Sequence, residues 1–384
     1  MDSVSTASAK PKSQSASPIA VTSAATGQVM LLNRTTLSLI RVIEPDRKAP
    51  VSGPMLVVED AVRKVFYVGN FNGGLGRIPM DGMKSETLDL GGVLVGNSIS
   101  PDGRLLAVNG AHDLTLRLVD AESWRLLSKT PYGNAADIPL HSHMTHGLAS
   151  THPIWLRDGS GVLTEDNIHE QVVLIGRDGK EMARQRLRSG VHTFLTTTSG
   201  EVLALAEGTV DGSVPPCVVV LAVPSLNIVR EVVIPLEPEE PAKLHHGMLS
   251  HDENVVVVGN MGPMHGDEYG TTVAAVRWRT GEVLWHVPTV RNAGHVRFLD
   301  KERVIVLGHQ DANLAVLDAR TGQRKEIWQV PGASSLGHSL AEEAERTILL
   351  IDSSTGRLMR LSKQGVKNQS PPLGEQIMEA SLSE

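Results

Sequence analysis

Histidines recur at one position in five consecutive segments of the sequence, each about nine or ten residues before the apolar core of the next strand-like run. The segments begin HPIWL, HTFLT, HGMLS, HVRFL and HSLAE, and their histidines are His152, His192, His246, His295 and His338. Scattered histidines would rarely occupy one position in successive units. Neutral imidazole is a good ligand for Zn, Cu, Fe and Ni, so the pattern predicts a transition-metal site formed by several of the five.

Other histidines accompany these five and are secondary candidates for the same site. His245 directly precedes His246, and His309 lies in a loop after an apolar run. The segment HSHMTH adds His141, His143 and His146. In the arrangement derived below, 13 of the 15 histidines lie at one end of the molecule, and His251 and His286 are the exceptions.

Two carboxylates stand out as candidate catalytic residues. Asp166 and Glu207 each directly follow a predicted strand in a unit that begins with one of the five recurring histidines. A carboxylate in that position can orient a metal-bound imidazole or serve as a general base. The predominance of imidazole over carboxylate argues against Ca²⁺ and Mg²⁺, which prefer oxygen ligands.

The elements that carry these residues are short strands. Runs such as VFYVGN, LLAVNG, VVVVGN and VIVLGH are four to six residues long and are bounded by Gly, Asn, Asp or Ser, and helical periodicity is nearly absent. The runs form a repeating unit of about 42 residues, which is the length of a four-stranded propeller blade. Inner strands line the central channel of a propeller, so equivalent histidines at their starts would surround one mouth.

The two ends of the chain predict how the ring closes. Near the N-terminus PIAVTSA, GQVMLLNR and LSLIRVIE form three strands without a first one, and IMEASLSE near the C-terminus resembles a first strand. Joining them completes an eighth blade and removes exposed sheet edges; seven blades are the alternative. We therefore predict an all-β, single-domain β-propeller over residues 18–384, preceded by a disordered tail over residues 1–17, which are rich in Ser, Ala and Lys.

The segment NSISPDGRLLAVNGAHDLTLRLVDAESWRLL resembles the YVTN-type and WD-repeat-like propeller repeats through its SPDGRLLAV core and its VDAESW turn. The resemblance extends over most of the chain and implies a propeller fold, which by itself does not define a function. A histidine ring on a propeller axis is similar in principle to the metal sites of carotenoid cleavage oxygenases and nitrous oxide reductase. The sequence lacks the long insertions of the former and the cysteine-rich copper domain of the latter, so no residue correspondence follows.

These observations favour a metal-dependent oxidoreductase or oxygenase that uses Fe or Cu and acts on a small molecule. One alternative is a lactonase, hydrolase or lyase that uses Zn or Mn to polarise a carbonyl group. Another is an anion-binding site made of partly protonated histidines. The last is a non-catalytic scaffold, although the 12 Phe, Trp and Tyr residues provide few anchors for a protein partner.

Composition limits the remaining partners and the compartment. The formal net charge of −7 is spread along the chain without a basic stripe, so we do not expect nucleic-acid binding. No apolar stretch is long enough to cross a membrane. The single cysteine, Cys217, excludes an internal disulfide, and no apolar segment typical of a secretion signal is present. We therefore expect a cytoplasmic protein, and the sequence does not predict its oligomeric state.

Overall fold

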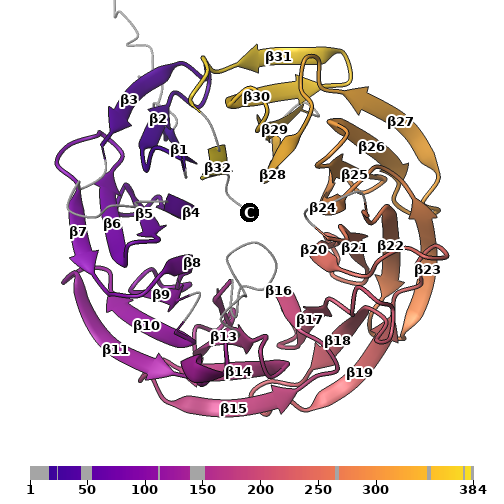
Figure 1. The fold of residues 1–384 in the computed structure, drawn as a ribbon, viewed down its shortest axis with the longest axis horizontal. Coiled ribbons are helices and arrows are strands. Elements are labelled where there is room, and N and C mark those ends of the chain that lie inside the picture. The colour runs from indigo at the N-terminus through magenta and orange to yellow at the C-terminus, as the bar shows by residue number, and fades with distance from the viewer. Residues whose placement is uncertain are drawn as a thin grey trace, which may run out of the picture.

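The computed structural model describes residues 17–23, 25–44, 54–110, 113–138, 152–263, 268–343, 347–374 and 377–381. These residues form eight four-stranded antiparallel sheets arranged as blades around a central axis (Figure 1). The prediction of an all-β propeller with eight blades is confirmed. The predicted tail lies almost entirely outside the described residues.

The blades follow one another along the chain, and the bounds of their strands are as follows. Blade 1 consists of β1 (Ile19–Ser23), β2 (Val29–Leu32), β3 (Leu39–Ile43) and β32 (Ile377–Ala380), and blade 2 of β4 (Pro54–Asp60), β5 (Val65–Asn70), β6 (Gly74–Pro79) and β7 (Glu86–Asp89). Blade 3 consists of β8 (Leu94–Ile99), β9 (Leu105–Gly110), β10 (Thr115–Asp120) and β11 (Arg125–Pro131), and blade 4 of β12 (Ile154–Trp155), β13 (Gly161–Asp166), β14 (Gln171–Gly176) and β15 (Glu181–Arg186). Blade 5 consists of β16 (Val191–Thr196), β17 (Val202–Ala206), β18 (Cys217–Leu221) and β19 (Ile228–Val233), and blade 6 of β20 (Leu244–Leu249), β21 (Val256–Asn260), β22 (Thr272–Arg277) and β23 (Glu282–Pro288). Blade 7 consists of β24 (Ala293–Phe298), β25 (Arg303–Gly308), β26 (Asn313–Asp318) and β27 (Arg324–Gln329), and blade 8 of β28 (Leu336–Glu343), β29 (Thr347–Asp352), β30 (Arg357–Ser362) and β31 (Gly365–Gln369).

The ring closes within blade 1, where the two ends of the described chain meet. β32 pairs antiparallel with β1, and Val21 lies opposite Ala380. The main-chain N–H of Ser381 donates to the carbonyl of Ala20 at 2.8 Å, and the N–H of Ala20 donates to the Ser381 hydroxyl at 2.8 Å. The predicted closure by a strand from each end is therefore present.

The hydrophobic core lies between neighbouring blades. Several second and third strands are apolar on both faces because another blade packs on each side, which explains continuous runs such as VVLI in β14 and VVVL in β18. Leu174 of blade 4 and Ala204 of blade 5, for example, belong to one cluster of buried residues. The outermost strands, such as β3 and β11, are mostly exposed.

Turns between the outer strands use glycine where the backbone requires it. Gly281 and Gly322, in the repeated turn sequences WRTG and ARTG, have φ angles of 83° and 70°. A residue with a Cβ is strained in this region, so glycine is favoured.

Seven inner strands carry a β-bulge or register irregularity near their first residues, at one end of the propeller axis. These strands are β4, β8, β16, β20, β24, β28 and β32. In β16 the bulge falls at His192, between the paired residues Val191 and Thr193. In β20 it falls at His245 and His246, between the paired residues Leu244 and Gly247. A bulge re-aims side chains that regular alternation would place on a blade face, so it turns these imidazoles toward the channel.

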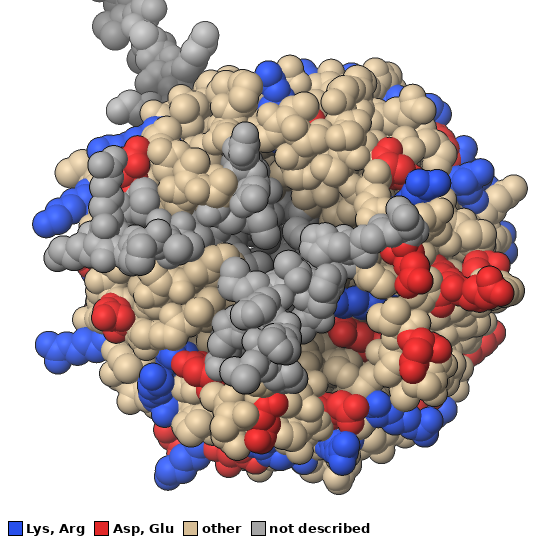
Figure 2. Space-filling view, in the orientation of Figure 1, with Lys and Arg blue, Asp and Glu red and all other residues tan. Residues whose placement is uncertain are grey.

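Among the described residues the one helical element is the 3₁₀ turn η1 (Ala135–Asp137), and no helix is long and apolar enough to cross a membrane. Figure 2 shows basic and acidic side chains interspersed around the perimeter of one face, with no stripe of a single sign among the described residues.

Candidate metal centre

Six histidines from four consecutive blades form a continuous cluster near the starts of the inner strands. They are His152, His192, His245, His246, His295 and His309, and adjacent ring centres lie between 3.9 and 5.8 Å apart. Four of the five recurring histidines are therefore brought together, along with two of the secondary candidates.

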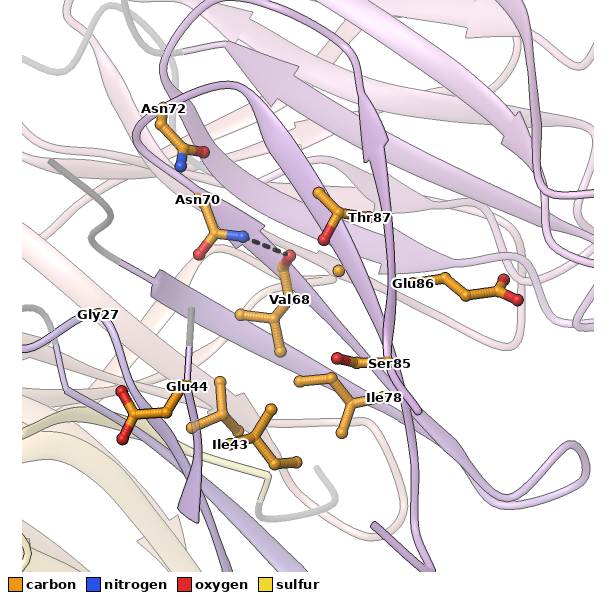
Figure 3. Close-up of a pocket in the computed structure, with 12 residues that line it drawn as sticks. Gly27, Ile43, Glu44, Val68, Asn70, Asn72, Ile78, Ser85, Glu86 and Thr87 are labelled. Atoms are coloured by element: carbon orange, nitrogen blue, oxygen red, sulfur yellow. Dashed lines mark hydrogen bonds between the residues drawn. The ribbon is translucent and has the colours of Figure 1, made fainter. Parts of the chain in front are cut away.

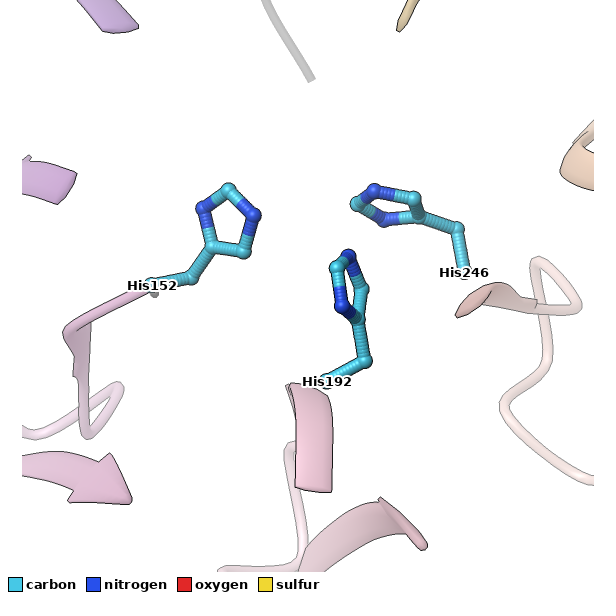
Figure 4. Close-up of side chains that lie close together, drawn as sticks. All are labelled: His152, His192 and His246. Carbon is cyan, nitrogen blue, oxygen red and sulfur yellow. The ribbon is translucent and has the colours of Figure 1, made fainter. Parts of the chain in front are cut away.

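One trio within the cluster has the geometry of a metal-binding site. His152, His192 and His246 place one nitrogen each within 4.8 Å of the others, and Figure 4 shows the three rings converging from separate elements. Their ring centres are 5.5, 5.8 and 5.1 Å apart. An ion bound at about 2.0–2.1 Å with tetrahedral angles would hold imidazole centres about 5.2 Å apart. The trio thus suits such an ion after small side-chain movements.

A second trio overlaps the first. His245, His246 and His295 also place one nitrogen each within 4.8 Å of the others, and His246 belongs to both trios. These rings are closer together, with centres 4.4, 5.0 and 4.2 Å apart, and His245 and His295 are buried.

Glu207 lies behind His192, just after β17. Its Oε1 is 3.5 Å from His192 Nδ1, so the carboxylate favours a proton on that nitrogen and leaves the Nε2 lone pair for a metal ion. Burial by itself raises the pKa of Glu207, but its hydrogen bond with His192 and its electrostatic interactions with Lys243 and His192 outweigh that effect and lower the pKa overall.

His295 is oriented through a second histidine. The Nδ1 of His309 is 2.9 Å from the carbonyl oxygen of Leu336, which can only accept a hydrogen bond, so His309 Nδ1 carries a proton. In its neutral form His309 then accepts at Nε2, which lies 2.9 Å from His295 Nδ1. His295 consequently donates from Nδ1 and has its lone pair on Nε2.

Two histidines of the cluster, His152 and His309, are uncharged at neutral pH. Burial, reinforced by the neighbouring His192, lowers the pKa of His152 to about 3. Burial also lowers the pKa of His309 to about 4, although its hydrogen bond to Leu336 opposes the shift. Neutral imidazoles can ligate a metal ion but provide no charge for an anion, so these two histidines favour a metal ligand role over anion binding.

Asp166 does not contact the cluster in the way that its sequence position suggested. Its Oδ2 lies 2.8 Å from His169 Nδ1, and its Oδ1 accepts hydrogen bonds from the main-chain N–H groups of Ile168 and His169. His169 Nε2 lies 3.2 Å from Asp137 Oδ2. Asp166 therefore stabilises the loop after β13 and links it, through His169, to η1.

This link predicts a pH-dependent contribution to stability. The hydrogen bond with Asp166 raises the pKa of His169, against an opposing effect of burial, and the charges of Asp166 and Asp137 raise it further. A raised pKa stabilises the fold fully below the unfolded value of about 6.5, and the stabilisation disappears as pH rises through the folded value. His169→Gln should lower Tm by roughly 1–2 °C at pH 5.5 and by less at pH 9. Calorimetry at both values tests this, and an equal change at both would contradict it.

The remaining predicted ligands are only partly placed. The main chain of His338 is the third residue of β28 and lies within the bulge between Leu336 and Leu340. His141, His143 and His146 lie outside the described residues.

Glu165 is a neighbour of the cluster that the sequence did not single out. It is fully buried, and its Oε1 accepts a hydrogen bond from the main-chain N–H of His152 at 3.3 Å. The nearby acidic residue Asp166 carried the more visible signal because it ends the strand, whereas Glu165 is its penultimate residue.

A cavity of about 280 Å³ lies elsewhere, between blades 1 and 2, and Figure 3 shows its lining. It contains no histidine, and its two carboxylates already have partners: Glu44 accepts a hydrogen bond from Gln28 at 3.0 Å, and Glu86 pairs with Arg77. The histidine cluster is the better candidate because several groups with related chemistry converge there.

Comparison with known proteins places the chain among propellers. Residues 225–377 match a family model described as outer membrane protein assembly factor BamB. This repeat type differs from the YVTN-type and WD-repeat-like repeats that the sequence resembles, so that finer assignment is not supported. The chain matches none of the curated proteins with which it was compared.

Three solved structures share the fold. The dihydro-heme d1 dehydrogenase NirN has a TM-score of 0.70 and 13% identity, with 96% of this chain and 76% of that chain covered. BamB from Moraxella catarrhalis has a TM-score of 0.60 and 12% identity, with 83% and 85% covered. Hydrazine synthase from Kuenenia stuttgartiensis has a TM-score of 0.58 and 13% identity, with 83% and 97% covered. At these identities the likeness concerns the fold alone.

Proposed function

We propose that this protein binds a transition-metal ion through the histidine cluster and uses it as an oxidoreductase acting on a small molecule. The observation that carries the proposal is the convergence of His152, His192 and His246 from three separate blades on one point. Imidazole is a ligand for Fe, Cu, Zn and Ni, whereas Mn²⁺ prefers oxygen ligands and binds most weakly in the divalent series.

Redox chemistry at Fe or Cu is compatible with the ligand set. Three neutral imidazoles leave the ion's charge uncompensated in the first coordination sphere, which favours an anionic or oxygen-derived species at an open position. A dehydrogenase and a hydrazine synthase occur on the same fold, which is compatible with a redox role. Glu207 is the described carboxylate best placed to orient a ligand, and it lies close enough to receive a proton through His192.

A zinc-dependent hydrolase or lyase is the second candidate. It is favoured by the near-tetrahedral spacing of the first trio, since Zn²⁺ in proteins is usually four-coordinate and tetrahedral. In that case the ion would polarise a carbonyl group and lower the pKa of a bound water.

Metal binding by untagged, metal-depleted protein tests the proposal. We expect about one Cu²⁺ or Zn²⁺ ion per chain by titration and elemental analysis, and much weaker binding of Mn²⁺. Protein loaded with Cu or Fe should also be reduced and reoxidised reversibly, as followed by its absorption and electron paramagnetic resonance spectra. Trace metal content with every ion would refute metal binding, whereas tight binding of Zn²⁺ without reversible redox chemistry of Cu or Fe would favour the hydrolase.

A further inference from the structure

We infer that the cluster offers a single ion two overlapping positions that share His246, one tetrahedral and one right-angled, and that Glu207 and His309 are the respective positioning residues. This inference rests on the proposed metal binding and deepens it. The tetrahedral position consists of His152, His192 and His246, and the right-angled position consists of His245, His246 and His295.

The spacing of the rings distinguishes the two positions. Imidazoles bound at right angles to one another would have ring centres about 4.5 Å apart, compared with about 5.2 Å at the tetrahedral angle. In the second trio the separations of 4.4 and 4.2 Å, which both involve His246, match the right angle, and the third, 5.0 Å between His245 and His295, is wider. In the first trio the separations of 5.5, 5.8 and 5.1 Å match the tetrahedral angle. Zn²⁺ and Cu⁺ accept tetrahedral sites, and Cu²⁺ prefers tetragonal ones. The two positions should therefore select different ions.

Each position has one ligand whose far nitrogen is held from outside the trio. Glu207 holds His192 Nδ1 at 3.5 Å in the first position, and His309 holds His295 Nδ1 at 2.9 Å in the second. A polar partner at the second nitrogen is the usual companion of a metal-bound histidine. Because each trio has one histidine with such a partner, His192 in the first and His295 in the second, both trios are oriented for metal binding.

The two positions cannot be filled together by divalent ions. They share His246, and neither trio contains a carboxylate among its ligands. Two neighbouring divalent ions would repel each other strongly in this largely buried environment, where charge is poorly screened. Only one of the two positions is therefore occupied at a time, and His246 is a ligand in either position.

Paired substitutions at the positioning residues test the inference with Zn²⁺ and Cu²⁺ as probes. Glu207→Gln should weaken Zn²⁺ binding 10–100-fold and affect Cu²⁺ much less, while His309→Leu should do the reverse. His309→Gln, which retains a donor for Leu336 and an acceptor for His295, should restore Cu²⁺ binding. His246→Ala should weaken both ions, and His286→Ala, on an exposed part of β23, should change neither.

Spectra separate a positioning role from a general loss of structure. The paramagnetic resonance spectrum of bound Cu²⁺ should change with His309→Leu and return toward the wild type with His309→Gln. The inference is overturned if the Glu207 and His309 variants affect the two ions in the same proportion, or if two ions bind per chain. If either of these results is found and the wild-type protein still binds metal tightly, the proposed function stands and only the inference of two positions fails. If the wild-type protein binds neither ion, the proposed function and the inference both fail.

Discussion

Replacing His152, His192 and His246 together by alanine should abolish metal binding while the propeller remains folded. The substitution removes every lone pair of the tetrahedral trio and the shared ligand of the second trio, so neither can form three bonds to an ion. We expect no ion to remain after dialysis, which corresponds to an affinity loss of at least about 10³-fold, because second-shell changes alone cost 10–100-fold. Titration of wild-type and variant protein with Zn²⁺ and Cu²⁺ gives the measurement.

The fold should survive because the core lies between the blades and away from this mouth. The residues that stabilise blades 4 and 5, such as Leu174 and Ala204, are buried among apolar neighbours outside the cluster. Far-UV circular dichroism should be unchanged. His251→Ala combined with His286→Ala is the matched control, since both imidazoles are exposed outside the cluster. Metal retained by the triple variant would place the site elsewhere, with His141, His143 and His146 as the next histidines to test.

The fold could be predicted from the sequence because a propeller repeats one local pattern. Each apolar run with its flanking turn identifies a blade, and the incomplete sets at the two ends predict β1, β2, β3 and β32 as one sheet. The repeat also explains why the five recurring histidines could be recognised from the sequence. Equivalent positions in a radially repeated fold lie at equal distance from the axis, so a recurring residue type indicates a shared location.

The details of the site depend on backbone irregularities that the sequence does not mark. Regular alternation would send His245 and His246 to opposite sides of β20, yet both join the cluster because a bulge lies between Leu244 and Gly247. Pro153 offers no N–H for strand pairing, and β12 is reduced to Ile154–Trp155, so His152 precedes the strand instead of starting it.

Side-chain pairing across blades was equally invisible from the sequence. The contact of His309 with Leu336 joins blade 7 to blade 8, and these residues are 27 positions apart. In the sequence, Glu207 and Asp166 each directly follow a predicted strand. Only Glu207 is paired with one of the five recurring histidines, His192, whereas Asp166 is bound by His169 in the adjacent turn. The partner that a side chain binds depends on which group lies closest to it in space, and residue propensities and sequence periodicity do not predict these distances.

Deleting residues 377–384 should strongly destabilise the propeller, because β32 supplies the innermost strand of blade 1. The deletion removes the antiparallel pairing with β1 and both hydrogen bonds between Ala20 and Ser381. It also removes Ala380, which packs in the apolar cluster that contains Ile19 and Leu349. At about 1 kcal/mol for each lost hydrogen bond, plus the lost burial, the free energy of unfolding should fall by roughly 5 kcal/mol or more.

The larger consequence is an open edge where the ring should close. Without β32, the unpaired N–H and C=O groups of β1 face the channel and can pair with another chain, which promotes aggregation. We expect Tm to fall by roughly 10 °C, with loss of soluble protein at higher temperature. Deletion of residues 1–16 is the control, since their composition predicts no contribution to the core. Calorimetry and light scattering distinguish the outcomes, and an unchanged Tm after removal of β32 would mean that seven complete blades and an open eighth suffice for stability.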